Sequence, residues 1–140
     1  MQSFDTIILG GGPGGTTAAR ILAQAGKSVA LVEKTHLGGT CLNCGCIPTK
    51  MLLGAVAPLA LLHAQQRTRV AKGEIAVDFT ALQTRVSRFT RGTSQTLGKS
   101  LASLGVTIFN GHGEGIAPGK IRVHGKDGHT DLEAQHVILA

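Results

Sequence analysis

The chain has 140 residues, of which 42 % are hydrophobic, 20 are glycine and none is tryptophan or tyrosine. This length and composition fit one folded domain with an aliphatic core and argue against a disordered chain. The net charge is +6, and a single aromatic residue, Phe89, stands among the basic residues Arg85 to Lys99, so no platform for stacking successive bases is expected and we predict no nucleic-acid partner.

The N-terminus predicts a strand and not a signal peptide, because it lacks the charged region and the small-residue cleavage site that a signal peptide has. The most apolar stretch, residues 51–64, is too short to cross a bilayer and contains Gly54 and Pro58. We therefore expect a soluble, cytoplasmic protein with no membrane partner. Three cysteines within six residues of a cytosolic protein indicate catalysis or metal binding, not a structural disulfide framework.

The first third of the chain predicts a strand–helix–strand unit. Residues 4–9 are a short apolar run that ends at a glycine, which is typical of a buried parallel strand. Residues 13–25 predict a helix of small residues that Gly26 ends, and residues 28–33 predict a second strand.

The turn between the first strand and its helix carries the pattern GxGxxG, formed by Gly10, Gly12 and Gly15. Gly10 allows the tight turn, Gly12 lets a pyrophosphate approach the backbone, and Gly15 lets the helix pack closely on the strand. The helix N-terminus supplies free N–H donors for the phosphates. Glu33, at the end of the second strand, is placed to accept hydrogen bonds from the hydroxyls of an adenosine ribose and would repel a 2′-phosphate. The motif predicts a dinucleotide site but does not distinguish FAD from NAD.

Three arrangements of Cys41, Cys44 and Cys46 are consistent with their spacing. They could form a redox disulfide between Cys41 and Cys46, a CxxC pair of Cys41 and Cys44, or a metal site that would need a fourth ligand. A regular helix favours the Cys41–Cys44 pair, because residues five apart point in different directions. A Cys41–Cys46 bond needs a distorted backbone, which Gly45 and a proline in the first turn allow. A helix N-terminus there would lower the pKa of an exchange thiol.

The rest of the chain predicts two long helices and a set of strands. The first helix covers about residues 47–66, where Pro58 should kink or split it. An irregular segment, residues 68–77, precedes a second helix that runs from residue 78 or 79 to 104, with Asp78 as its N-cap and a possible break near Gly92. Strands follow at residues 106–110, 120–124 and 131–139, with a turn at residues 125–128.

Residues 38–50 read GGTCLNCGCIPTK, and this segment resembles the redox-active segment of the flavoprotein disulfide reductases, the pyridine nucleotide-disulfide oxidoreductases. Every position matches the family pattern except Cys44, where the family usually has valine. The order of elements from Phe4 to Ala140 also follows the family's N-terminal FAD region. Leu42 resembles dihydrolipoamide dehydrogenase more than mercuric or glutathione reductase, which remain alternatives. A catalytically incompetent thiol- or metal-binding fragment is the non-enzyme alternative.

The resemblance implies an α/β fold, with a truncated Rossmann-like FAD-binding domain made of a parallel sheet, helices and a small antiparallel β element. Residues 1–140 would be the N-terminal part of that domain, and the NAD-binding and dimerisation domains are absent from this chain. The implied enzyme passes electrons from a dithiol, with lipoamide expected, to the disulfide, then to FAD and then to NAD. The full-length enzyme is expected to be a homodimer, and this piece alone is expected to be inactive.

The resemblance also assigns roles to residues. Cys41 would exchange with the substrate disulfide, Cys46 would face the flavin, and Lys50 would lie near the flavin ring, where a positive charge stabilises its reduced form. No metal ligands are expected. The residues expected to bind the cofactor are Gly10, Gly12, Pro13, Gly14, Gly15, Glu33, Lys34, Gly39, Thr40, Lys50 and Gly113.

Overall fold

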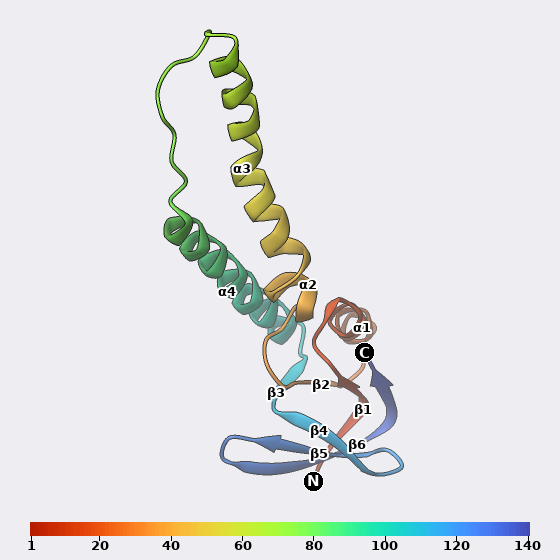
Figure 1. The fold of residues 1–140 in the computed structure, drawn as a ribbon. Helices are drawn as coiled ribbons and strands as arrows, with labels where there is room; N and C mark the ends of the chain where they lie inside the picture. The colour runs from red at the N-terminus through yellow and green to blue at the C-terminus, as the bar shows by residue number, and fades with distance from the viewer.

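The computed structural model describes residues 1–140. All strands belong to one six-stranded sheet in the order β3-β2-β1-β6-β5-β4 (Figure 1). The strands β1, β2, β3 and β6 pair in parallel, whereas β4, β5 and β6 pair antiparallel. The strands are β1 (Gln2–Leu9), β2 (Val29–Glu33), β3 (Thr107–Asn110), β4 (His112–Ala117), β5 (Lys120–Gly125) and β6 (Gly128–Leu139). The helices are α1 (Pro13–Gln24), α2 (Gly39–Asn43), α3 (Cys46–Arg67) and α4 (Phe79–Ser103).

The predicted strand–helix–strand unit is confirmed as β1, α1 and β2. β1 and β2 pair in parallel, with Ile7 opposite Ala30. The helix begins at Pro13, and its chain reverses at Gly26, whose φ of +78° is accessible to glycine without strain. This unit places the carboxyl ends of two neighbouring strands beside the N-terminus of α1.

Neighbouring residues of β1 pack into two different cores, because side chains alternate across a strand. Ile8 packs with Ala19 of α1 and Leu101 of α4 on one face of the parallel sheet. Ile7 packs on the other face with residues of the antiparallel strands, among them Val123 and Leu132. The fold therefore has three layers, helices, parallel sheet and antiparallel β element, and the expected Rossmann-like α/β class is confirmed.

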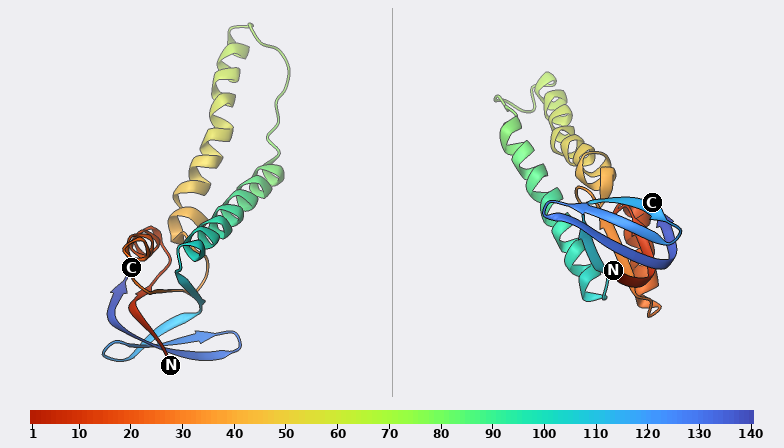
Figure 2. Two further views of the ribbon diagram at one scale, coloured as in Figure 1. Left: turned by 180° about the vertical axis from the view of Figure 1, so that it is seen from behind. Right: turned by 90° about the horizontal axis from the view of Figure 1, so that it is seen from below.

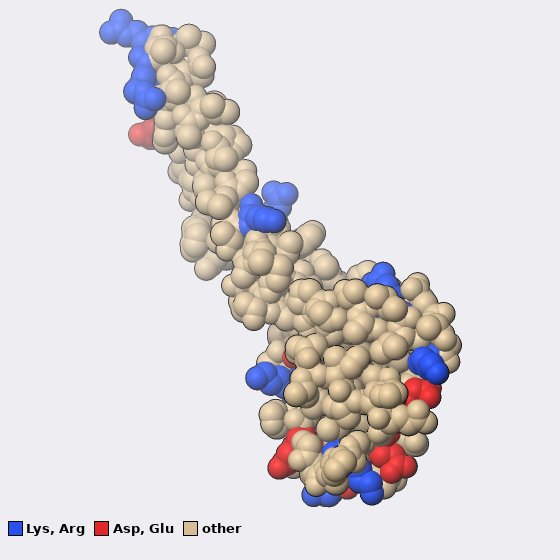
Figure 3. Space-filling model, turned by 90° about the vertical axis from the view of Figure 1, so that its right-hand side faces the viewer, with Lys and Arg blue, Asp and Glu red and all other residues tan.

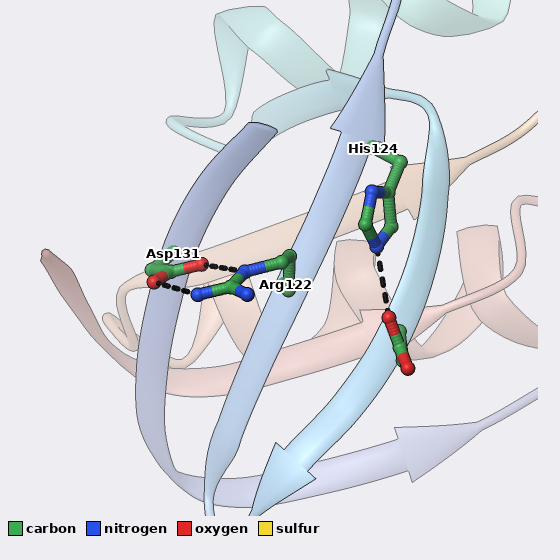
Figure 4. Close-up of polar contacts among 4 residues, drawn as sticks. Arg122, His124 and Asp131 are labelled. Carbon is green, nitrogen blue, oxygen red and sulfur yellow. Dashed lines mark hydrogen bonds and ion pairs between the residues drawn. The ribbon is translucent and has the colours of Figure 1, made fainter. Parts of the chain in front are cut away.

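The antiparallel layer consists of β4, β5 and the first half of β6. The sequence did not predict β4, because the segment HGEGIA is one-third glycine and largely exposed, without an alternating apolar pattern. Two polar pairs link the strands of this layer (Figure 4). The Arg122 guanidinium donates to both oxygens of Asp131 at 2.7 and 2.8 Å, and His124 Nε2 lies 2.9 Å from a Glu114 oxygen.

The helices α3 and α4 form an arm, residues 46–103, that projects from the sheet (Figures 1 and 2). The prediction of two long helices is confirmed, as is Asp78 as the N-cap of α4, whose carboxylate accepts from Ala81 N–H at 2.8 Å. Of the kink or split expected at Pro58, the split is wrong, because α3 is a single helix. Pro58 lacks the N–H that would have bonded the carbonyl of Gly54, and the loss of this one bond does not end α3. The possible break at Gly92 is also absent.

The arm exposes much of its apolar surface. No residue of α3 is buried, and Leu53 and Leu61 are 61 % and 72 % exposed. On the face that Figure 3 shows, Lys and Arg side chains stand at the tip of the arm and in one group partway along it, with uncharged surface between them. The stretch Gly39–Arg67, made of α2 and α3, has a mean hydropathy of 1.6 over its most apolar window and is long and apolar enough to cross a membrane by length and composition alone. The premise that the apolar stretch is too short is therefore wrong, although one such helix is weak evidence of a membrane span.

Candidate functional site

A cavity of about 840 Å³ lies where β1 and β2 end, beside the N-terminus of α1 and against α2. Ligands of open parallel sheets bind at this edge, outside the carboxyl ends of the strands. The glycine turn after β1, the end of β2, the start of α2 and the beginning of β4 all contribute to its wall. Segments that are far apart in the sequence thus meet around one hollow.

The N-terminus of α1 has free hydrogen-bond donors that face this cavity. Gly12 is the N-cap, and no side chain caps the helix. The first N–H groups of a helix have no partner within it, and here they form a place for an anion. A Cβ built on Gly12 would meet no atom within 4 Å, so the space beside its backbone is open to a ligand. Gly15 differs, because its Cβ would collide with the Gly10 carbonyl oxygen; its role is close packing of helix on strand.

Two further glycines, Gly38 and Gly39, close the cavity from the loop before α2. Gly38 and Gly39 adopt left-handed backbone with φ of +96° and +58°. The Gly38 N–H donates to the Gly11 carbonyl at 2.7 Å, and a Cβ on Gly39 would lie 2.9 Å from the Gly12 Cα. The loop before α2 therefore docks backbone to backbone on the loop before α1. This contact brings the cysteine segment to the phosphate cradle.

The Glu33 carboxylate is buried at the floor of the site, with 8 % of the residue exposed. Its Oε2 accepts from Gly11 N–H at 2.7 Å, and its Oε1 accepts from both the N–H and the hydroxyl of Thr35 at 2.7 and 2.9 Å. Burial by itself raises the pKa of this carboxyl, but the hydrogen bonds from Thr35 and Gly11 outweigh it and hold the pKa below its ordinary value. Glu33 is thus an anion that also ties the two loops together, and one acceptor position on Oε2 is left for a ribose hydroxyl.

The cysteine segment is broken into two helices. α2 ends at Asn43, Cys44 and Gly45 interrupt it, and α3 begins at Cys46. Gly45 is required at this break, because a Cβ there would lie 2.9 Å from the Thr40 carbonyl oxygen. The break places Cys46 near enough to Cys41 to affect the pKa of that thiol.

All three cysteines are free thiols in the structure. The hydrogen bond to Cys46 raises the pKa of the Cys41 thiol, and partial desolvation adds to this, while the Lys50 charge opposes it. The backbone N–H of Cys46, at the start of α3, lowers the pKa of Cys41 as expected of a helix N-terminus, but the net shift of that thiol is upward. No group of three or more His, Cys, Asp or Glu side chains is arranged to hold a metal ion.

The structure brings most of the expected cofactor residues to one cavity. Those that line it are Gly10, Gly12, Pro13, Glu33, Lys34, Gly39, Thr40 and Gly113, together with Cys41. Gly14, Gly15, Lys50 and Cys46 are not among the lining residues. Gly14 and Gly15 belong to the first turn of α1, and Cys46 and Lys50 belong to the first turns of α3, next to Cys41.

Sequence reasoning missed three residues that shape the site. Thr35 supplies two of the hydrogen bonds to Glu33. The Asn43 amide donates to the carbonyls of Leu37 and Gly39 at 3.1 and 2.9 Å, which fixes the loop before α2. His112 lines the cavity from β4. A threonine two residues after an acidic strand end is a recognisable turn signal, whereas the role of Asn43 depends on a loop conformation that no spacing reveals.

Comparison with known proteins identifies relatives over the whole chain. The family described as pyridine nucleotide-disulphide oxidoreductase matches residues 4–140. Dihydrolipoyl dehydrogenase of Chlamydia muridarum is 34 % identical over 99 % of this chain and 30 % of its own length. Dihydrolipoyl dehydrogenase of Bacillus subtilis is 36 % identical over 95 % of this chain and 30 % of its own length.

A solved structure has the same fold. The Cu(II) complex of the HOCl-induced flavoprotein disulfide reductase RclA from Escherichia coli superimposes with a TM-score of 0.79 and 29 % identity, over 100 % of this chain and 29 % of that one. The chain thus spans about 30 % of the length of the curated relatives it matches.

Proposed function

This chain belongs to the pyridine nucleotide-disulphide oxidoreductase family, and we propose that it is the N-terminal FAD-binding, redox-disulfide portion of a dihydrolipoyl-dehydrogenase-like enzyme. The observation that carries the proposal is the single cavity lined by the N-terminus of α1, by Glu33 and by Cys41. Cys46 is near enough to Cys41 to affect the pKa of that thiol. A dinucleotide site and a pair of thiols therefore adjoin.

The residues present fit FAD. The open space beside Gly12 and the uncapped start of α1 would hold its pyrophosphate. Glu33 would accept a ribose hydroxyl on Oε2, and the Gly113 backbone in β4 would border the adenine. FAD, when bound, supplies a two-electron acceptor for the dithiol. Lys50 follows Cys46 by one helical turn and places a positive charge on the same side of the site.

The thiols would oxidise a dithiol by two exchange steps. One substrate thiolate attacks the sulfur of Cys41 in the Cys41–Cys46 disulfide, which forms a mixed disulfide and releases Cys46 as a thiolate. The second substrate thiol then displaces Cys41. The substrate leaves as a disulfide, and the chain keeps the two electrons as a dithiol. Cys41 suits the exposed role because it lines the cavity and is partly exposed.

FAD binding by the isolated chain tests the cofactor assignment. Flavin fluorescence should change on titration with the chain, and Gly12→Ala should weaken binding by about tenfold or more, because its methyl group enters the space for the pyrophosphate. Gly54→Ala is the matched control, since a Cβ there also meets nothing within 4 Å and Gly54 does not line the cavity. Equal effects of the two substitutions would contradict the assignment.

Thiol counting tests the disulfide. The chain, incubated with oxidised lipoamide and acid-quenched, should lose two thiols. Cys44→Ser should lose two thiols as readily as the unsubstituted chain, because Cys41 and Cys46 remain. Cys46→Ser should resist oxidation. If Cys46→Ser were oxidised as readily as Cys44→Ser, the pair would be Cys41 and Cys44 and the proposal would be wrong.

The steps of the proposed reaction beyond dithiol oxidation would be carried out by the longer protein. We propose NAD as the final electron acceptor, a lipoamide-type substrate and a homodimer, with residues 1–140 as the N-terminal part of the FAD-binding domain. What supports this is the dihydrolipoyl dehydrogenase name of relatives that are about three times as long. The cytoplasmic location and the absence of a membrane partner stay predictions.

A further inference from the structure

The inward stripe of α4 changes from apolar to polar at its middle. Leu82, Val86, Leu97 and Leu101 mark a stripe of partly or fully buried apolar residues at helical spacing. Between them, at the positions that continue the stripe, stand Thr90 and Ser94. Thr90 is 7 % exposed, and its hydroxyl donates to the carbonyl of Ser87 at 3.2 Å. A helix that only needed to pack would keep this stripe apolar.

A separate cavity of about 420 Å³ lies against this polar segment. All of its lining residues are polar, and none is acidic: His36, Asn43, Ser87, Thr90, Arg91, Ser94 and Gln95. Five of them come from one face of α4, and two come from the loop before α2 and its end. Arg91 gives the hollow a permanent positive charge with no carboxylate in its wall to neutralise it.

The donors and acceptors of this wall define the ligand. The Arg91 guanidinium is a planar fork suited to two oxygens of an oxyanion. The hydroxyls of Ser87 and Ser94 can donate or accept. The Asn43 amide nitrogen already donates to Leu37 and Gly39, so its free group is an acceptor that suits a hydroxyl on the ligand.

We propose that this cavity is a binding site for an oxyanion that carries a hydroxyl, with a phosphate group as the smallest example. The site is distinct from the dinucleotide cavity but shares His36 and Asn43 with it. Because Asn43 fixes the loop that leads to Cys41, an occupied site would also stabilise the cysteine segment. This inference does not depend on FAD binding.

NMR titration of the chain with inorganic phosphate, against chloride at equal ionic strength, tests the proposal. The backbone amides of Thr90, Arg91 and Ser94 should shift in a saturable manner. Arg91→Ala should weaken phosphate binding by about tenfold or more. Arg91→Lys should bind phosphate more tightly than Arg91→Ala but more weakly than the unsubstituted chain. Arg85→Ala is the matched control, because Arg85 lies on the same helix, is exposed, and does not line the cavity.

A second variant separates this site from the phosphate cradle at α1. Gly12→Asp places a carboxylate in that cradle, where a side chain meets no atom, and should leave the α4 shifts intact. The proposal is wrong if Arg91→Ala and Arg85→Ala weaken binding equally, since phosphate would then respond to surface charge alone. It is also wrong if the α4 shifts vanish in Gly12→Asp, since phosphate would then bind only at the cradle. Failure of FAD binding would leave both results unchanged.

Discussion

Replacing Glu33 by glutamine should destabilise the fold before it affects any ligand. The carboxylate accepts three hydrogen bonds from two loops, and glutamine offers one oxygen where glutamate offers two. The NH₂ group must then face either the Gly11 N–H or the N–H and hydroxyl of Thr35. Two donors would oppose each other at a residue that is 8 % exposed.

The loss of stability follows from the number of hydrogen bonds that the substitution removes. A hydrogen bond to a charged group contributes about 1.5–3 kcal/mol, and a buried donor left without an acceptor costs about 1–3 kcal/mol. We therefore expect Glu33→Gln to lower the free energy of unfolding by about 2–4 kcal/mol, a large part of the stability of a domain of this size. Thr35→Val removes only one hydroxyl bond, and its expected cost is about 1 kcal/mol.

Urea unfolding measured as a function of pH checks both the size and the origin of this effect. The pKa of Glu33 in the folded chain lies below its ordinary value of 4.5. The stabilisation by its carboxylate is therefore complete above that value and is lost as the pH falls through the lower folded pKa. The difference between the unsubstituted chain and Glu33→Gln should be constant at neutral pH and shrink in acid. The lowered pKa values of Asp5 and Asp131 affect both proteins alike.

The reasoning is refuted if Glu33→Gln unfolds within about 0.5 kcal/mol of the unsubstituted chain, a change typical of a neutral surface substitution. It is also refuted if the difference is unchanged at pH 3, since the carboxylate charge would then have no part in it. An effect of Thr35→Val as large as that of Glu33→Gln would show that the hydroxyl of Thr35, not the carboxylate, holds the two loops together.

Three further predictions concern the fold. Gly92→Ala should raise the free energy of unfolding by about 1 kcal/mol in urea titrations, because a Cβ there meets nothing and alanine favours the helix. Gly15→Ala should lower the free energy of unfolding by about 2 kcal/mol or more, because its Cβ would collide with the Gly10 carbonyl. Equal effects of the two substitutions would contradict this reasoning. Asp78→Ala should cost about 1 kcal/mol by removing the N-cap of α4, and Asp78→Asn should retain most of that stability in thermal unfolding. Arg122→Met should destabilise the chain less than Asp78→Ala does, because the pair with Asp131 is solvent-exposed, and the difference from the unsubstituted chain should shrink at high salt.

The parallel half of the fold could be predicted from the sequence because its signals are local. An apolar run, a glycine turn, a helix of small residues and a second apolar run determine β1, α1 and β2 without reference to the rest of the chain. The β4 strand could not be predicted this way, since two of its six residues, Gly113 and Gly115, have low strand propensity and the strand is held by pairing with β5.

The residues of the site could be predicted from the sequence, but the hydrogen bonds and loop contacts between them could not. The GxGxxG pattern and the spacing to Glu33 place both in the same cavity. The docking of Gly38 on Gly11 and the clamp by Asn43 depend on left-handed loop conformations, which spacing does not specify. The continuity of α3 through Pro58 was missed because a proline weakens a helix locally, while the contacts at the ends of the helix decide whether it continues.

The central position of β1 has a consequence for biosynthesis. On one side β1 pairs with β2, which follows it within about twenty-five residues, but on the other side Leu9 pairs with Leu139. A nascent chain leaving the ribosome therefore carries β1 with one row of amides and carbonyls unpaired until nearly the entire segment has been translated. During that interval the exposed edge is open to chaperones and to mispairing with other chains, so slowing translation before residue 128 should prolong chaperone association.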